Sequence, residues 1–225
     1  EALAACRAMA DRLVGLSAER IWSEMRQILL APDPAAALDL MVENEILDHV
    51  LPEARQRVRL AALCHLEDRL GVESDVVRRL LAVIDVAPDE AAKLVRRLRL
   101  SRKEGSRIAA VVKHARELNS KMDAKSSRRA LYRLGVDLFR DAALIGWAGD
   151  GVAAWGGPWR VAEDWSPLAF PLNGADVLAL GVVKGPDVGR VLGRVEDWWM
   201  GEDFSPNRAA CLRRLRKEAA QAEEP

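Results

Sequence analysis

Residues 170–204, FPLNGADVLALGVVKGPDVGRVLGRVEDWWMGEDF, predict two helices joined by a glycine turn. Asn173 is a favourable N-cap for the first helix, because its side chain accepts hydrogen bonds from the free amides of the first turn. Gly181 and Gly185 supply the turn, since residues without a Cβ atom adopt positive φ readily. Pro186 suits the first position of the second helix, where a backbone N–H would have no partner.

The second helix carries one apolar stripe at positions i, i+3, i+4, i+7 and i+10, which is typical of an amphipathic helix. Its members are Val188, Val191, Leu192, Val195 and Trp198. Adjacent residues on a helix point about 100° apart. We therefore expect Trp198 to be buried and Trp199 to be partly exposed or to cover the final helix of the chain.

Two parts of this stretch, PLNGADVLALGVVKGPDVGRVL and VEDWWMGEDF, resemble the C-terminal tail of the bacterial (class II) CCA-adding tRNA nucleotidyltransferases and the related poly(A) polymerases. Residues 16–21 and 41–52 fit the same family, so the resemblance covers nearly the whole chain. It implies an all-helical fragment of body and tail that binds tRNA. A catalytic head would then add C, C and A to the tRNA 3′ end from CTP and ATP with Mg²⁺.

The motifs that the family uses in its head do not occur here. No two aspartates are separated by a single residue, so the D-x-D pair for two magnesium ions has no counterpart. The nearest match to the family's E-D-x-x-R element begins at Glu67-Asp68, but Gly71 stands where the arginine belongs. We interpret Glu67 and Asp68 as an ordinary helix surface. The chain begins at Glu1 without an initiator methionine, which suggests a fragment, and we predict that it is catalytically inactive on its own.

The net charge of zero conceals a strongly basic segment. Residues 93–133 carry 14 basic and 3 acidic side chains, a net charge of +11, whereas residues 1–92 and 134–225 carry net charges of −7 and −4. Basic charge concentrated in one segment is the pattern expected for a protein that binds a polyanion. The candidate RNA-binding residues are Arg102, Lys103, Arg107, Lys113, Lys125, Arg128, Arg129, Arg133, Lys184 and Gly185. The alternative for each side chain is an ordinary solvated helical face.

The glycine turn has two interpretations. A helix N-terminus preceded by glycines is a plausible phosphate site, because its free amides and its dipole both favour an anion. Pro186 removes one amide donor, however, and Asp187 places a carboxylate there that Lys184 offsets only in part. We therefore favour a structural role, in which Gly181 and Gly185 form the turn and Gly189 lets two helices approach closely.

The remaining sequence has helical periodicity and no alternating β pattern, so we predict an all-α fold, an elongated bundle of many helices. Ser101 and Glu104 form a capping-box pair, and Ser126 or Ser127 is expected to cap the next helix. The expected regions are a neck remnant and start of the body (1–52), a helical body (53–146), a connector (147–169), a tail (170–219) and a frayed end (220–225). Trp155 and Trp159 lie at helical spacing, which favours core positions over stacking on bases.

The other residue classes give little support to further chemistry. Cys6, Cys64 and Cys211 are odd in number and widely spaced, which is typical of reduced core or near-core thiols. The three histidines are not accompanied by the H-x-H, H-D or C-x-x-C patterns that would indicate a metal site. No apolar run reaches the roughly 18 residues of a membrane span, and we expect a cytoplasmic protein. Two alternatives to a tRNA-binding fragment stay open: the corresponding region of a poly(A) polymerase, and a helical scaffold for protein partners.

Overall fold

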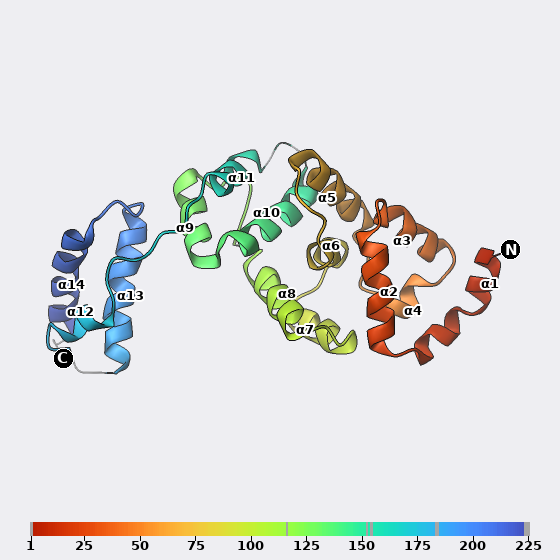
Figure 1. Ribbon diagram of the computed structural model, residues 1–225, viewed down its shortest axis with the longest axis horizontal. Coiled ribbons are helices and arrows are strands. Elements are labelled where there is room, and N and C mark those ends of the chain that lie inside the picture. The colour runs from red at the N-terminus through yellow and green to blue at the C-terminus, as the bar shows by residue number, and fades with distance from the viewer. Residues whose placement is uncertain (1, 116, 152, 154, 183–184, 223–225) are drawn as a thin grey trace.

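The computed structural model describes residues 2–115, 117–151, 153, 155–182 and 185–222, and the regular elements among them are all helices, as predicted (Figure 1). In chain order they are α1 (Ala2–Ala8), η1 (Ala10–Gly15, a 3₁₀ helix), α2 (Ala18–Leu30), α3 (Pro34–Glu43), α4 (Leu47–Val50), α5 (Arg57–Leu70), α6 (Val76–Val83), α7 (Pro88–Arg97), α8 (Arg102–His114), α9 (Ala124–Leu134), α10 (Val136–Asp150), α11 (Gly156–Glu163), α12 (Gly174–Leu178), α13 (Pro186–Gly201) and α14 (Arg208–Ala222). The chain extends from α1 at one end of the elongated molecule to α12–α14 at the other (Figure 1).

Helix α6 is the centre of the larger part of the molecule, which we call the body. All eight of its residues are buried, including Arg78 and Arg79. Helices α2, α5, α8 and α10 pack against it. A helix that is buried on every side must occupy such a central position, and six of its eight residues are apolar. The presence of two arginines in it means that their charges must be neutralised inside the body.

The body has one continuous hydrophobic core, which extends along the chain from Trp22 to Ala162. Part of the segment predicted as a connector belongs to this core. Trp155 and Trp159 are buried, as expected, and α11 packs against α9 and α10. Gly146 makes this packing possible, because a Cβ atom there would lie 2.4 Å from the Cζ2 atom of Trp155. The link between body and tail is therefore residues 164–173.

Helices α12, α13 and α14 form a second, separate core, which we call the tail. The predicted caps are confirmed: the Asn173 side chain accepts a hydrogen bond from the Ala175 amide at 2.9 Å, and Pro186 begins α13. Gly181 has a φ of 89°, as the predicted turn requires. On α13 and α14 the buried residues facing each other include Val191, Val195, Trp199, Cys211 and Leu215.

The predicted orientation of the paired tryptophans is wrong. Trp199 is 4% exposed, and its Nε1 donates a hydrogen bond to the Pro206 carbonyl at 3.0 Å. Trp198 is only partly buried, with the Arg214 guanidinium 5.7 Å from its ring centroid. The reason is that the buried line of α13 follows the i, i+4, i+8 positions Val191, Val195 and Trp199, so Trp198 lies at its edge.

Two smaller expectations are also wrong, and the third, that the cysteines are core or near-core thiols, fails only for Cys6. The helix after residue 123 begins earlier than predicted, and its cap is Asp123, whose Oδ1 accepts from the Ser126 amide at 2.7 Å. A Cβ atom at Gly189 would have nothing within 4 Å, so this glycine serves no close helix contact. Cys6 is exposed, whereas Cys64 is partly buried and Cys211 is buried.

Candidate nucleic-acid interface

Helices α7 and α8 form a hairpin that presents much of the basic segment. Pro88 begins α7, and the Glu90 side chain accepts a hydrogen bond from the Ala87 amide at 2.9 Å. At the start of α8 the predicted capping box is confirmed: Ser101 Oγ accepts from the Glu104 amide, and Glu104 accepts from the Ser101 amide. The two helices pack side by side, so the basic residues of both lie on one structural unit.

Seven basic side chains of this segment are exposed and have no ion-pair partner among the residues that the structure describes. They are Lys93 and Arg96 of α7, Arg102, Lys103 and Lys113 of α8, Lys121 in the following loop, and Lys125 at the start of α9. Arg102 and Lys113 are separated by 11 residues, or about three helical turns, so they lie on the same face of α8. Four of the predicted candidates, Arg102, Lys103, Lys113 and Lys125, belong to this group.

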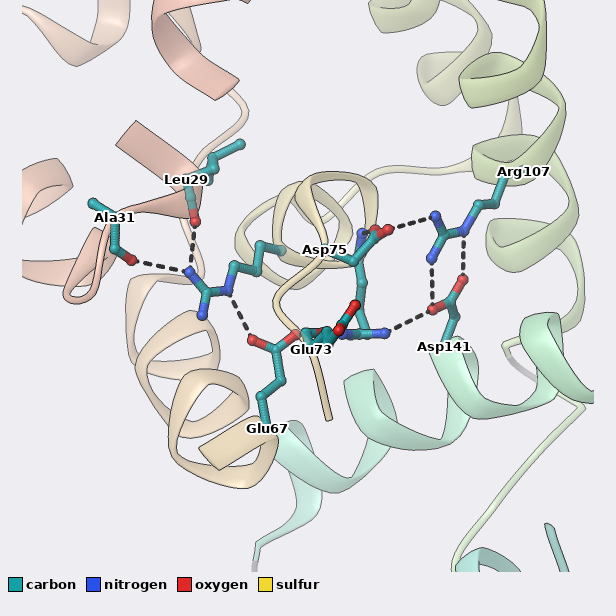
Figure 2. A network of polar contacts seen from close by, with 9 residues as sticks. Leu29, Ala31, Glu67, Glu73, Asp75, Arg107 and Asp141 are labelled. Carbon is teal, nitrogen blue, oxygen red and sulfur yellow. Dashed lines mark hydrogen bonds and ion pairs between the residues drawn. The ribbon is translucent and has the colours of Figure 1, made fainter. Parts of the chain in front are cut away.

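Arg107, by contrast, is part of a network inside the body (Figure 2). Its Nε and Nη2 atoms donate to Asp141 at 2.7 and 2.9 Å, and its Nη1 donates to Asp75 at 2.8 Å. The hydrogen bond to Asp141 raises the pKa of Arg107. Burial opposes the ionised form of Asp75, but the hydrogen bonds from Arg107 and from the Arg78 amide outweigh it and lower the pKa of Asp75.

The same network neutralises the two arginines of α6 (Figure 2). Glu67 Oε1 accepts from Arg78 Nε at 2.8 Å, and Glu67 Oε2 accepts from Arg79 Nε at 2.8 Å. Arg79 Nη1 also donates to the carbonyls of Leu29 and Ala31, at 2.8 and 3.0 Å. The interpretation of Glu67 as an ordinary helix surface is therefore wrong. Its neighbour Asp68 is exposed, as expected.

Three further candidates on α9 have partners in the tail. Arg128 donates to Asp203 through Nε at 2.8 Å and through Nη2 at 2.6 Å. Arg129 donates to the carbonyls of Met200 and Gly201, at 3.0 and 3.2 Å. Arg133 Nη2 donates to Asp197 at 3.0 Å. The role of these arginines in RNA binding stays a prediction, but the structure gives each of them a partner within the chain.

The candidates at the glycine turn are less informative. Lys184 lies outside the described residues. Gly185 is exposed and has an extended backbone, with a φ of 163°. Asp187 in the first turn of α13 forms an ion pair with Arg190.

Two groups of exposed cations lie outside the candidates predicted from the sequence. Lys93, Arg96 and Lys121 of the basic segment form the first group. In the tail, α14 exposes Arg213, Arg216 and Lys217, which have no ion-pair partner within the described part of the chain. The spacing of the α14 residues, i, i+3 and i+4, could have identified a single basic face. The net charge of −4 over residues 134–225 concealed it.

The described residues offer no other prominent chemistry. They contain no group of three or more histidine, cysteine, aspartate or glutamate side chains that could bind a metal ion. No helix among them has the length and apolar character that crossing a bilayer requires. The fold and the unpaired cations thus define the chain as an all-helical protein with a surface suited to a polyanion.

Comparisons with known proteins specify this class. Residues 1–57 match the family model described as the probable RNA- and SrmB-binding site of polymerase A. CCA tRNA nucleotidyltransferase 1, mitochondrial, of Mus musculus is 24% identical over 229 residues, which cover 96% of this chain and 50% of the relative. The Homo sapiens protein of the same name is 22% identical and the Danio rerio protein 24%, with coverage of 96% and 50% in each case.

The chain is therefore a homologue of the CCA tRNA nucleotidyltransferases over nearly its whole length, and the resemblance identified from the tail motifs is confirmed. The chain spans about half the length of the curated relatives it matches. Its assignment to the bacterial class II enzymes stays a prediction.

Proposed function

We propose that this chain is the tRNA-binding part of a CCA-adding nucleotidyltransferase. The observation that carries the proposal is the group of seven exposed, unpaired cations on and beside the α7–α8 hairpin. Phosphate neutralisation supplies most of the affinity of a protein for nucleic acid without regard to sequence. The match of residues 1–57 to an RNA-binding family model supports the same conclusion from a different part of the chain.

Catalysis, in this proposal, resides in the other half of the protein. The relatives are about twice as long as the part that this chain matches, and the D-x-D pair is absent from the chain. Mg²⁺, CTP and ATP would bind to that catalytic head in the cytoplasm, while the present residues anchor the tRNA. The chain alone should then fail to extend a tRNA that lacks CCA when it is incubated with CTP, ATP and Mg²⁺; extension would contradict this part of the proposal.

The binding proposal is tested by a salt titration of tRNA affinity, using tRNA transcripts without CCA. The logarithm of the association constant should fall linearly with the logarithm of salt concentration, by about 0.7 to 0.9 per neutralised phosphate. Replacing Lys103 and Lys113 by Ala should weaken binding and reduce the slope by about one to two. The melting temperature should not change, because both side chains are exposed and unpaired.

A charge-matched control removes two exposed arginines elsewhere, Arg69 of α5 and Arg160 of α11, which have no ion-pair partner among the described residues. This double variant should retain the affinity and the slope of the unmodified protein. Equal losses in both double variants would show a general charge effect rather than a site on the hairpin. Binding that does not depend on salt, or no binding, would overturn the proposal and favour a helical scaffold for protein partners.

A further inference from the structure

The body and the tail are held together by α9, which reaches the C-terminal half of α13. We call this contact the joint; it consists of Arg128, Arg129, Tyr132 and Arg133 of α9 with Glu196, Asp197, Met200, Gly201 and Asp203. Arg128 and Asp203 are paired through two parallel hydrogen bonds, a geometry that is both stronger and more directional than a single one. The hydrogen bond with Arg128 lowers the pKa of Asp203.

The joint also has an apolar part. The Tyr132 ring packs with the tail core, 5.6 Å from the Trp199 ring and 5.3 Å from the Phe204 ring. Its hydroxyl donates to Glu196. Burial raises the pKa of this hydroxyl, and the hydrogen bond to Glu196 raises it further. Trp165, in the link between body and tail, lies 5.8 Å from the same Phe204. A body residue and a link residue therefore converge on one tail residue, which restricts the orientation of the tail.

The two parts that the joint connects each expose unpaired cations. The body presents Arg102, Lys103 and Lys113 on α8, and the tail presents Arg213, Arg216 and Lys217 on α14. The body and tail have separate cores. Without the joint, only the link of residues 164–173 would relate the two groups of cations.

We propose that the joint residues position the α14 cations of the tail relative to the α8 cations of the body, so that both contact the phosphate backbone of one RNA. This inference rests on the proposed function. Once the body cations have bound the RNA, a tail held at a fixed distance from the body binds the same RNA at a high effective concentration. A flexible link would instead distribute the tail over many orientations and lower that concentration. Arg128, Arg129 and Arg133 are then positioning residues that act through the tail.

The test uses a joint variant of the whole chain with three changes: Tyr132→Phe, Asp197→Asn and Asp203→Asn. These remove the Tyr132 hydroxyl that donates to Glu196 and the negative charges that pair with Arg133 and Arg128, and they keep an aromatic ring at position 132 in the tail core. Asparagine also tolerates the positive φ of 54° at position 203. The variant gains two units of positive charge, so a purely electrostatic effect would strengthen RNA binding. Loss of positioning should weaken tRNA binding by about tenfold, in the opposite direction.

The same three changes made in a variant without the tail cations distinguish a loss of positioning from a loss of folding. In a protein with Arg213, Arg216 and Lys217 replaced by Ala, the joint changes should cause no further loss of affinity, because no tail cations remain to be positioned, and only the gain from the two added positive charges is expected. The two sets of changes are thus expected to be non-additive. Small-angle X-ray scattering of the free joint variant should show a broader distribution of dimensions at an unchanged content of helix.

The outcomes distinguish the two proposals. If the unmodified chain binds tRNA but the joint variant binds more tightly, the α9 arginines are direct phosphate ligands and the positioning inference is wrong. An equal loss of affinity in both backgrounds would also overturn it, since that result indicates damage to the fold. If the unmodified chain does not bind tRNA with a steep dependence on salt, the proposed function fails, and the inference fails with it.

Discussion

Glu67 Oε2 accepts a hydrogen bond from Arg79 Nε at 2.8 Å, and both side chains are almost completely buried, with exposed fractions of 1% and 6%. The other carboxylate oxygen is bound by Arg78. Glu67 lies four residues after Leu63 and seven after Leu60, so it continues the buried stripe of α5. Glu67 of α5 thus binds both arginines of α6, and Arg79 also donates to the Leu29 carbonyl at the end of α2. These contacts join the three helices in one network.

Replacing Glu67 by Ala should therefore destabilise the protein by about 3 to 5 kcal/mol, because two buried guanidinium groups lose their shared carboxylate. Chemical denaturation monitored by circular dichroism measures this change. The matched control is Asp68→Ala, one residue further along α5 and exposed, which should alter the free energy of unfolding by no more than about 0.5 kcal/mol. Similar effects of the two changes would contradict the role assigned to Glu67.

The sequence predicts the helices of this chain well because their signals are local. Stripes of apolar residues, the Ser101–Glu104 capping box and the proline at position 186 each act within a few residues. Whether a charged side chain is paired or exposed is harder to predict, because its partners are distant in the sequence. Arg128 and Asp203 are 75 residues apart, and Arg107 and Asp141 are 34 apart. The net charge of a stretch of sequence identifies the basic segment, but it does not distinguish an arginine with an ion-pair partner from one without.

Gly146 and Gly193 offer a comparison between two helical glycines in different surroundings. Gly146 lies against the Trp155 ring, and an added Cβ would be 2.4 Å from it, whereas a Cβ at Gly193 would have nothing within 4 Å. Gly146→Ala should destabilise the protein by about 1 to 3 kcal/mol through overpacking. Gly193→Ala should stabilise it by about 0.5 to 1 kcal/mol, because alanine favours the helix. Thermal melting measures whether each substitution raises or lowers the stability of the protein. Stabilisation by Gly146→Ala would contradict the packing of α11 on α10.

The three cysteines should differ in reactivity toward an aromatic disulfide reagent at neutral pH. Cys6 is exposed, whereas Cys211 is buried. Burial raises the pKa of Cys64 to about 11 and also raises the pKa of Cys211. Since the thiolate is the reactive form, one thiol should react quickly in the folded protein and three after unfolding. The Cys6→Ser variant should lose the fast phase, and a fast phase that persists would place a second thiol at the surface.

The joint between body and tail should resist mild acid, since the pKa of Asp203 is lowered by its hydrogen bond with Arg128. A carboxyl group with a lowered pKa in the folded state stabilises that state above its ordinary pKa, here 3.8, and loses this contribution as the pH falls through the lowered value. The difference in melting temperature between the unmodified protein and Asp203→Asn should therefore be constant from about pH 8 to about pH 5 and diminish only as the pH falls below 3.8. Glu202→Gln is the matched control, because the Glu202 side chain is exposed and has no ion-pair partner among the described residues. A difference for Asp203→Asn that disappeared between pH 7 and pH 5 would indicate that the carboxylate is not held by Arg128.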